Sequence, residues 1–156
     1  YNQVINNILN KYKYLEEFIM NKSLDFNNYW LAGFSDADAS FQIKIVNKDK
    51  ISLPEIGLNF QIDQKKDYLL RLIKNNLGGN IGYRKSEDTY YYGSTSFGSA
   101  KKVIKYFDNY HLQSSKYCNY LKWRKAYIIV QNKDHLTEKG VYMIKNIKDR
   151  INRNSV

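Results

Sequence analysis

The chain has 156 residues, a length that suits one domain with its own core, and 43% of them are hydrophobic, which excludes a disordered tail. It contains 25 Lys and Arg against 15 Asp and Glu, for a formal net charge of +10, and a domain this basic attracts polyanions, most commonly nucleic acid. No apolar run approaches the ~20 residues of a membrane-spanning helix, so we expect no membrane partner. The single cysteine, Cys118, excludes a multi-cysteine zinc site.

The hydrophobic pattern predicts helices and strands that alternate along the chain. Apolar residues recur at helical spacing over residues 4–20, and after a polar stretch a short helix is expected that ends near Asp38. The period then changes to two, and the segments 41–46 and 58–63 predict a pair of antiparallel strands. The remaining expected elements are a helix over 66–77, strands over 80–85 and 90–97, and helices over 99–110, 114–130 and 137–151.

This order predicts an α+β domain in which one antiparallel, four-stranded, curved sheet carries helices on a single face, in the order α-β-β-α-β-β-α. The outward residues of the strands are mostly polar, so the other face is expected to be open and basic, a surface suited to a DNA groove. Residues 1–28 are expected to form an N-terminal helix or linker, and residues 29–156 the domain that carries the function.

Residues 31–39 read LAGFSDADA and resemble the LAGLIDADG signature. The resemblance continues in order through FQIDQK at 60–65, GGNI at 78–81, LQSSKY at 112–117 and HLTEKG at 135–140. Several matches in order are more specific than one nonapeptide, so the chain resembles the LAGLIDADG homing endonucleases and intron maturases of the organellar, intron-encoded type. Ala39 stands where the motif usually ends in Gly, and Ser35 replaces an apolar residue, but neither change removes an expected ligand.

The motif also makes physical sense as a helix that pairs with another helix and binds a cation. Gly33 and Ala37 lie four residues apart, and with Phe34 they form the expected helix-pairing interface, because small residues let a second helix approach closely. Asp36 and Asp38 lie at the end of the helix, where the negative end of the dipole disfavours carboxylates. A divalent cation compensates that cost, and Mg²⁺, for which Mn²⁺ or Ca²⁺ can substitute in binding, prefers oxygen ligands.

The resemblance implies a role for each polar residue of the site. Asp38 is expected to hold the metal and act in catalysis, with the peptide carbonyl of Ala37 as a second metal contact, while Asp36 is expected to be a structural cap. Gln64 is expected to order water near the metal, and Lys116 to stabilise the phosphorane or perturb the water. The structural alternatives are that the aspartates terminate a helix, that Gln64 ends a surface strand and that Lys116 starts a solvated helix.

DNA contacts are expected from the polar sheet face and from basic residues around it. Glutamine suits adenine and lysine suits guanine in the major groove, whereas lysines beside the sheet position phosphates. The register of the second strand pair leaves its outward residues open. Expected base readers are Gln42, Lys44, Gln61 and Asp63, the candidates from the second strand pair are Tyr83, Arg84, Lys85, Tyr90 and Tyr92, and the phosphate contacts are Lys65 and Lys66.

The resemblance implies a site-specific DNA endonuclease that hydrolyses phosphodiester bonds of a long double-stranded target. One motif supplies one main carboxylate, so cutting both strands requires a second LAGLIDADG motif, from a homodimer mate or from the other half of a two-motif protein. The alternatives are an RNA maturase that helps a group I intron splice, with weak or no DNA cleavage, and a plain basic nucleic-acid-binding domain. Heavy use of Asn, Lys, Ile and Tyr is typical of AT-rich organelle genomes and favours a mitochondrion or other organelle.

Overall fold

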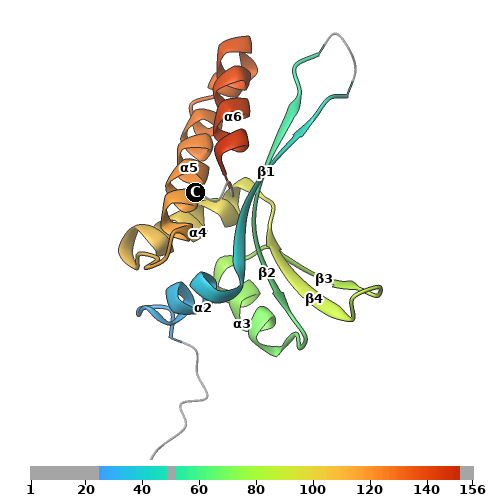
Figure 1. Ribbon diagram of the computed structural model, residues 1–156, viewed down its shortest axis with the longest axis vertical. Coiled ribbons are helices and arrows are strands. Elements are labelled where there is room, and N and C mark those ends of the chain that lie inside the picture. The colour runs from blue at the N-terminus through green and yellow to red at the C-terminus, as the bar shows by residue number, and fades with distance from the viewer. Residues whose placement is uncertain (1–24, 49–51, 152–156) are drawn as a thin grey trace, which may run out of the picture.

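The computed structural model describes residues 25–48 and 52–151, so the helix expected over residues 4–20 lies outside the described part of the chain. A helix, a strand pair, a helix, a second strand pair and the C-terminal helices follow one another in the expected order (Figure 1). None of the described helices combines the length and the apolar character that crossing a membrane requires. The elements are α2 (Trp30–Asp38), β1 (Ala39–Val46), β2 (Glu55–Gln64), α3 (Tyr68–Leu77), β3 (Asn80–Arg84), β4 (Thr89–Ser94), α4 (Phe97–Asn109), α5 (Lys116–Gln131), η1 (Asp134–Leu136) and α6 (Glu138–Arg150).

The four strands form one antiparallel sheet in the order β1-β2-β4-β3. The register pairs Phe41 with Phe60 and Ile62 with Tyr92, so these apolar residues share one face of the sheet. The helices lie against that face (Figure 1). The polar residues that alternate with these apolar residues along the strands occupy the other face. The predicted α+β arrangement, with helices on one side and an open face on the other, is therefore confirmed.

An aromatic cluster joins the sheet to helices α4 and α5. The ring of Phe41 in β1 lies 5.2 Å from that of Phe60 in β2, measured between centroids. The same ring lies 5.8 Å from Phe107 of α4 and 5.5 Å from Trp123 of α5. All four side chains are buried, and such pairs contribute about 0.5–1.5 kcal/mol each beyond their area burial. The cluster therefore supports the sheet directly behind its open face.

Local signals account for several helix ends. Helix α3 stops at Gly78 and Gly79, whose φ angles of 75° and 88° are ones that side chains rarely adopt. Helix α6 starts at the expected cap, where Thr137 Oγ1 accepts a hydrogen bond from Gly140 N at 3.1 Å. The short 3-10 helix η1 comes just before this cap, and the hydrophobic periodicity did not predict it because one turn is too short to show a period.

Candidate functional site

Helix α2 is anchored on its inner face and runs directly into the first strand. Ala32 N donates to Tyr106 Oη at 3.0 Å, and the same hydroxyl donates to Asn28 O at 2.7 Å. Burial raises the pKa of Tyr106 to about 12, so this hydroxyl stays protonated. Ala39 starts β1 with a φ angle of −92°, so the backbone at this position does not require the glycine that usually ends the motif. Asp38 is thereby held at the junction of helix and strand.

The outer face of α2 carries the small residues of the motif. Gly33 and Ala37 are exposed, and the half-buried rings of Trp30 and Phe34 in the same helix stack with their centroids 5.2 Å apart. A Cβ atom built on Gly33 meets no atom of the described chain within 4 Å. Packing among the described residues therefore does not account for a glycine at this position.

Asp36 connects α2 to the start of α5. Its carboxylate accepts hydrogen bonds from Gln113 N at 2.8 Å, from Ser114 N at 3.2 Å and from Ser114 Oγ at 2.6 Å. Burial acts to raise the pKa of Asp36, but these hydrogen bonds and the nearby charge of Lys116 outweigh it, and the pKa is lowered from its ordinary value. The negative charge lies before the N-terminus of α5, where the helix dipole favours it.

Asp38 is exposed, and its carboxylate meets a side chain from the end of β2. Gln64 Nε2 donates to Asp38 Oδ2 at 2.6 Å, although the two residues are 26 positions apart. The register of β1 and β2 pairs Ala39 with Ile62, and this pairing brings the end of β2 beside the end of α2. Two of the three expected catalytic residues are thus in direct contact.

Lys116, the first residue of α5, reaches the last carbonyls of α2. Its Nζ donates to Ala37 O at 2.8 Å and to Ser35 O at 3.3 Å. A cation at this place offsets the negative end of the helix dipole. The Ala37 carbonyl, which the family resemblance nominates as a metal contact, therefore already accepts a hydrogen bond from Lys116.

The donor set at the end of α2 fits a hard cation in part. Asp38 offers exposed carboxylate oxygens and Ala37 a carbonyl, which are the oxygen ligands that Mg²⁺ prefers. Across residues 25–48 and 52–151, no group of three or more His, Cys, Asp or Glu side chains could hold a metal ion. A metal at this place needs further ligands from outside these residues, such as phosphate, water or a second carboxylate.

A row of hydrogen-bonded polar side chains crosses the open face of the sheet. Consecutive members are 3.0–3.2 Å apart, and they come from β1, β2 and β3. The guanidinium of Arg84, at one end of the row, also lies 4.9 Å from the ring centroid of Tyr91. We refer to these side chains as the polar row: Ser40, Gln42, Asn59, Gln61, Asp63 and Arg84. Three of the four expected base readers, and one candidate from the second strand pair, belong to it.

The tyrosines expected at DNA do not lie on the open face. The register of β3 and β4 pairs Tyr83 with Tyr90 and Ile81 with Tyr92, which puts the three tyrosines on the helix side of the sheet. Tyr92 is fully buried, so its expected DNA contact is wrong, and burial raises the pKa of its hydroxyl. Tyr90 packs half-buried against the core, and Tyr83 Oη donates to Asp88 Oδ1 at 2.7 Å in the turn.

Sequence reasoning missed Tyr91 and Asn59, which both lie on the open face. Tyr91 is paired with Asp63 across β4 and β2, and Asn59 with Gln42 across β2 and β1. The strand signal is an alternation of apolar and polar residues, and a run of three tyrosines contains no such alternation. Only the register shows that the middle tyrosine faces outward.

The remaining expected contacts lie around the polar row. Lys44 is exposed on β1. Lys65 Nζ donates to the carbonyls of Glu87 and Asp88 at 2.8 and 3.2 Å, so it holds the turn between β3 and β4. The other expected basic contacts, Lys66 and Lys85, are exposed.

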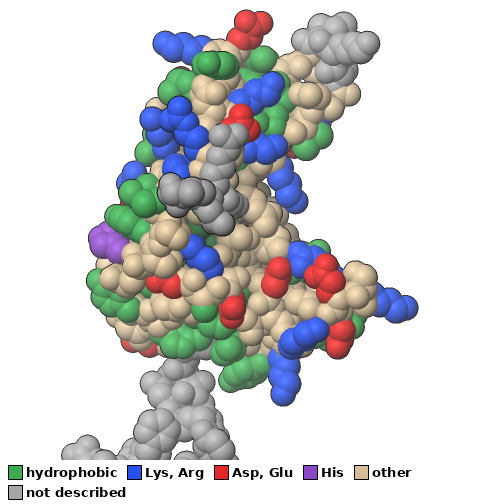
Figure 2. Space-filling model, in the orientation of Figure 1, with side chains coloured by type: hydrophobic (Ala, Val, Ile, Leu, Met, Phe, Trp, Pro, Cys, Tyr) green, Lys and Arg blue, Asp and Glu red, His purple; other side chains and the backbone are tan. Residues whose placement is uncertain are grey.

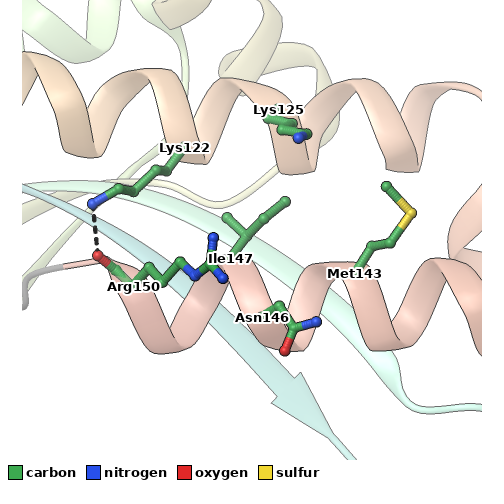
Figure 3. A pocket seen from close by; sticks show the side chains of 6 residues that line it. All are labelled: Lys122, Lys125, Met143, Asn146, Ile147 and Arg150. Carbon is green, nitrogen blue, oxygen red and sulfur yellow. Dashed lines mark hydrogen bonds between the residues drawn. The ribbon is translucent and has the colours of Figure 1, made fainter.

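Positive charge is concentrated on the helices and not on the sheet. Residues 97–151 contain twelve Lys and Arg against four Asp and Glu, whereas the described residues before 97 contain eight of each. The described part of the chain that contains the sheet therefore shows no excess of positive charge, and the charged members of the polar row are one acid and one base, Asp63 and Arg84. Lys and Arg side chains gather over α5 and α6 (Figure 2), where Lys122, Lys125 and Arg150 line a groove between the two helices (Figure 3).

Comparison with known proteins gives consistent matches. The sequence profile described as LAGLIDADG endonuclease matches residues 31–127. The chain is 68% identical over 150 residues to the "Uncharacterized cox1 intron-2 37.2 kDa protein" of Schizosaccharomyces pombe, covering 93% of this chain and 46% of that protein. It is 34% identical over 126 residues to the "Probable intron-encoded endonuclease 2" of Neurospora crassa, covering 78% of this chain and 26% of that protein.

Similar solved structures include I-SmaMI bound to an uncleaved DNA target in the presence of calcium ions, with a TM-score of 0.77 and 31% identity over 95% of this chain and 53% of that one. The LAGLIDADG homing endonuclease I-LtrWI bound to target DNA has a TM-score of 0.79 and 28% identity over 96% of this chain and 53% of that one. The chain spans about half the length of these relatives or less. From the profile match and the 68% identical relative, the chain belongs to the LAGLIDADG endonuclease family.

Proposed function

We propose that the chain supplies one half of a site-specific DNA endonuclease, a homing endonuclease that hydrolyses phosphodiester bonds of a long double-stranded target. The observation that supports this most is the contact of 2.6 Å between Gln64 and Asp38 at the end of α2. This exposed carboxylate lies at the edge of the open polar sheet face, so a duplex bound on that face passes beside it. Recognition and hydrolysis can therefore share one surface.

Mg²⁺ is the proposed cofactor, with Mn²⁺ or Ca²⁺ able to replace it in binding. Asp38 would hold the ion through its carboxylate, with the Ala37 carbonyl as a second oxygen once Lys116 yields it. The calcium ions named for the I-SmaMI complex are compatible with such an oxygen site. When bound, the metal supplies Lewis-acid stabilisation of negative charge and lowers the pKa of a bound water.

Gln64, Lys116 and Asp36 are proposed to hold the other parts of the site in place. Gln64 fixes the orientation of the Asp38 carboxylate through its hydrogen bond, and its amide can also bind water there. Lys116 keeps a positive charge at the same helix end, which favours the negative charge that develops on an attacked phosphate. Asp36, which binds the start of α5, is proposed as the structural cap that keeps Lys116 in place.

The face of α2 that the described residues leave exposed is proposed to pair with a second LAGLIDADG motif. Gly33 and Ala37 offer a flat backbone surface, and Phe34 borders it. A second motif adds the carboxylate that one chain lacks for cutting both strands. The chain's span of about half of its relatives favours a two-motif protein, and a homodimer provides the same pairing.

One observation favours a second function, which is RNA maturation. The basic groove between α5 and α6 lies in the helical layer, outside the sheet face that we assign to DNA. Group I intron RNA is a polyanion that could bind there, and the relatives named for introns are consistent with such a role. Relatives named for mitochondrial genes also support a mitochondrial location.

The test is cleavage of a plasmid that carries an intronless cox1 gene, chosen because of the 68% identical relative, by the chain alone and by a tandem fusion of two copies. We expect the tandem fusion to linearise this plasmid with Mg²⁺ and not with EDTA, and to leave a plasmid without the gene intact. Failure of both proteins on this plasmid and on plasmids carrying other intronless mitochondrial genes, combined with rescue of intron splicing, would overturn the endonuclease proposal in favour of the maturase.

A further inference from the structure

We infer that the polar row is one polarised chain of hydrogen bonds, in which Asp63 and Asn59 determine which edge Gln42 and Gln61 offer to a base. The inference rests on the proposed function, since it concerns how the open face recognises DNA. It assigns Asn59 and Asp63 as positioning residues that act through the two glutamines. It also predicts that base preferences at two separate positions are coupled through the protein.

The direction of the hydrogen bonds in the polar row is determined first by a charged pair, Arg84 and Asp63. Arg84 Nη1 lies 3.0 Å from Asp63 Oδ2, which holds the carboxylate in place. An ionised carboxylate can only accept hydrogen bonds, so Gln61 must point its Nε2 toward Asp63, at 3.0 and 3.2 Å from the two oxygens. Gln61 Oε1 is then directed the other way, toward Asn59. One anchored carboxylate thus decides the orientation of the first glutamine.

Asn59 determines the orientation of the second glutamine, Gln42, in the same way. Its Nδ2 donates to Gln61 Oε1 and to Gln42 Oε1, both at 3.2 Å, and these two bonds use both hydrogens of the amide. Gln42 is therefore also held with its oxygen toward Asn59, and its Nε2 donates to Ser40 Oγ at 3.0 Å. The polarity runs without a break from β3 through β2 to β1.

The surroundings of Asn59 suit a residue that acts through others. Its side chain lies under the two glutamines, and the residue is only 4% exposed, so it offers no edge to a base. Gly93 on β4 leaves room beside it, because a Cβ at that position would lie 3.2 Å from Asn59 Oδ1. This oxygen has no hydrogen-bond partner in the described part of the chain, so the side chain of Asn59 is bound there only through its amide nitrogen.

The consequence concerns base recognition. A glutamine that recognises adenine presents an acceptor and a donor together, and which side each occupies depends on the orientation of its amide. Turning over Gln61 breaks its bonds to Asp63 and Asn59, and turning over Gln42 breaks its bond to Asn59. Bonds in such a chain also strengthen one another. The side-chain amides of Gln42 and Gln61 are therefore expected to reorient together when a substitution at Asn59 or Asp63 exchanges a donor for an acceptor, or the reverse.

The first experiment selects duplexes from a library with a randomised core, using the tandem fusion with Ca²⁺, and reads the base preference at each position by sequencing. Asn59→Asp, which replaces the shared donor by an acceptor, is expected to change the preference at two separated positions by about tenfold each. The matched control Gln42→Ala is expected to change only one of these positions. If Asn59→Asp changes one position or none while still binding DNA, the coupling is overturned.

The second experiment needs no DNA and uses Asp63→Asn, a substitution at a partly exposed site. The side-chain amide ¹H–¹⁵N signals of Gln42, Asn59 and Gln61 are recorded by NMR with and without the substitution. We expect the Gln42 signals to shift although it does not contact residue 63, while the backbone spectrum shows an unchanged fold. Unshifted Gln42 signals would overturn the polarised chain. Selection of no duplex by the unmodified fusion would instead count against DNA binding itself, and the NMR result would stand separately.

Discussion

The part of the chain that forms the sheet and the C-terminal helices behind it differ in charge and in how their side chains are hydrogen-bonded. The described residues before 97, which include the sheet, carry equal numbers of basic and acidic residues, whereas residues 97–151 carry twelve against four. On the sheet, side chains are bonded to one another across three strands. Attraction of a polyanion acts over about 10 Å at moderate salt, but recognition of a base requires direct contact. We therefore propose that attraction of the polyanion and recognition of its bases belong to different surfaces.

The largest expected effect is on the cleavage rate, and it comes from a substitution that leaves both surfaces intact. Asp38→Asn should reduce the single-turnover cleavage rate of the tandem fusion by about a thousandfold or more, because removal of a metal-holding carboxylate costs several kcal/mol of transition-state stabilisation. Since Asp38 is exposed, the free energy of unfolding should be unchanged. Cleavage at the wild-type rate would show that another group holds the metal.

The comparison itself is tested by neutralising the helical groove. Replacing Lys122, Lys125 and Arg150 together by Gln should make nucleic-acid binding less dependent on salt, because each lost phosphate contact lowers the slope of log affinity against log salt by about 0.7–0.9. The base preference selected by the sheet should stay the same. Equal slopes for the triple variant and the unmodified chain, measured with both duplex DNA and intron RNA, would mean that this groove contacts no phosphate.

The next effect concerns Asp36, which joins α2 to the helical layer. Asp36→Ala should lower the free energy of unfolding by about 1–2 kcal/mol at pH 7, because the hydrogen bonds that its carboxylate accepts from Gln113 and Ser114 are lost. Because its pKa is lowered in the folded protein, this stabilisation is present above the ordinary value near 4 and is lost as the pH falls through the folded value. Urea unfolding of both proteins from pH 7 to pH 3 should show the difference shrinking. A constant difference would show that the charge of Asp36 does not contribute.

The smallest expected effect is on the free energy of unfolding and concerns Ser35, which lies in the same helix α2. Ser35 is fully buried in α2, and its hydroxyl has no hydrogen-bond partner in the described part of the chain. Ser35→Ala should therefore raise the free energy of unfolding by about 1 kcal/mol, because an unsatisfied buried hydroxyl is removed and little volume is lost. A decrease in the urea midpoint would reveal a partner for this hydroxyl.

Much of the fold could be predicted from local patterns. The change from helical spacing to alternation after Asp38, the Gly78-Gly79 stop and the Thr137 cap are all features of neighbouring residues, and each was confirmed within about two positions. The motif could be located because nine consecutive residues carry it. Patterns of this kind are decided by backbone preferences and by burial of one face, which need no knowledge of distant residues.

The site required more than such patterns. Asp38 contacts Gln64 across 26 positions, and Asp36 contacts Ser114 across 78, and only the packing of α2 between β2 and α5 brings these pairs together. The family resemblance named these residues, but no spacing in the sequence predicts their contacts. The tyrosines show the same limit, since a shift of one residue in strand register moves a side chain to the opposite face.

The sequence by itself determined the order of helices and strands, the position of the motif and the overall positive charge. Periodicity and composition are properties of the chain read one segment at a time, so these conclusions did not depend on the arrangement in space. The tertiary structure alone decided which of three adjacent tyrosines faces outward and that the polar side chains of three strands form one hydrogen-bonded row. Register and packing join residues that are far apart in sequence, and these contacts distinguish the surface proposed to recognise bases from the one proposed to attract phosphates.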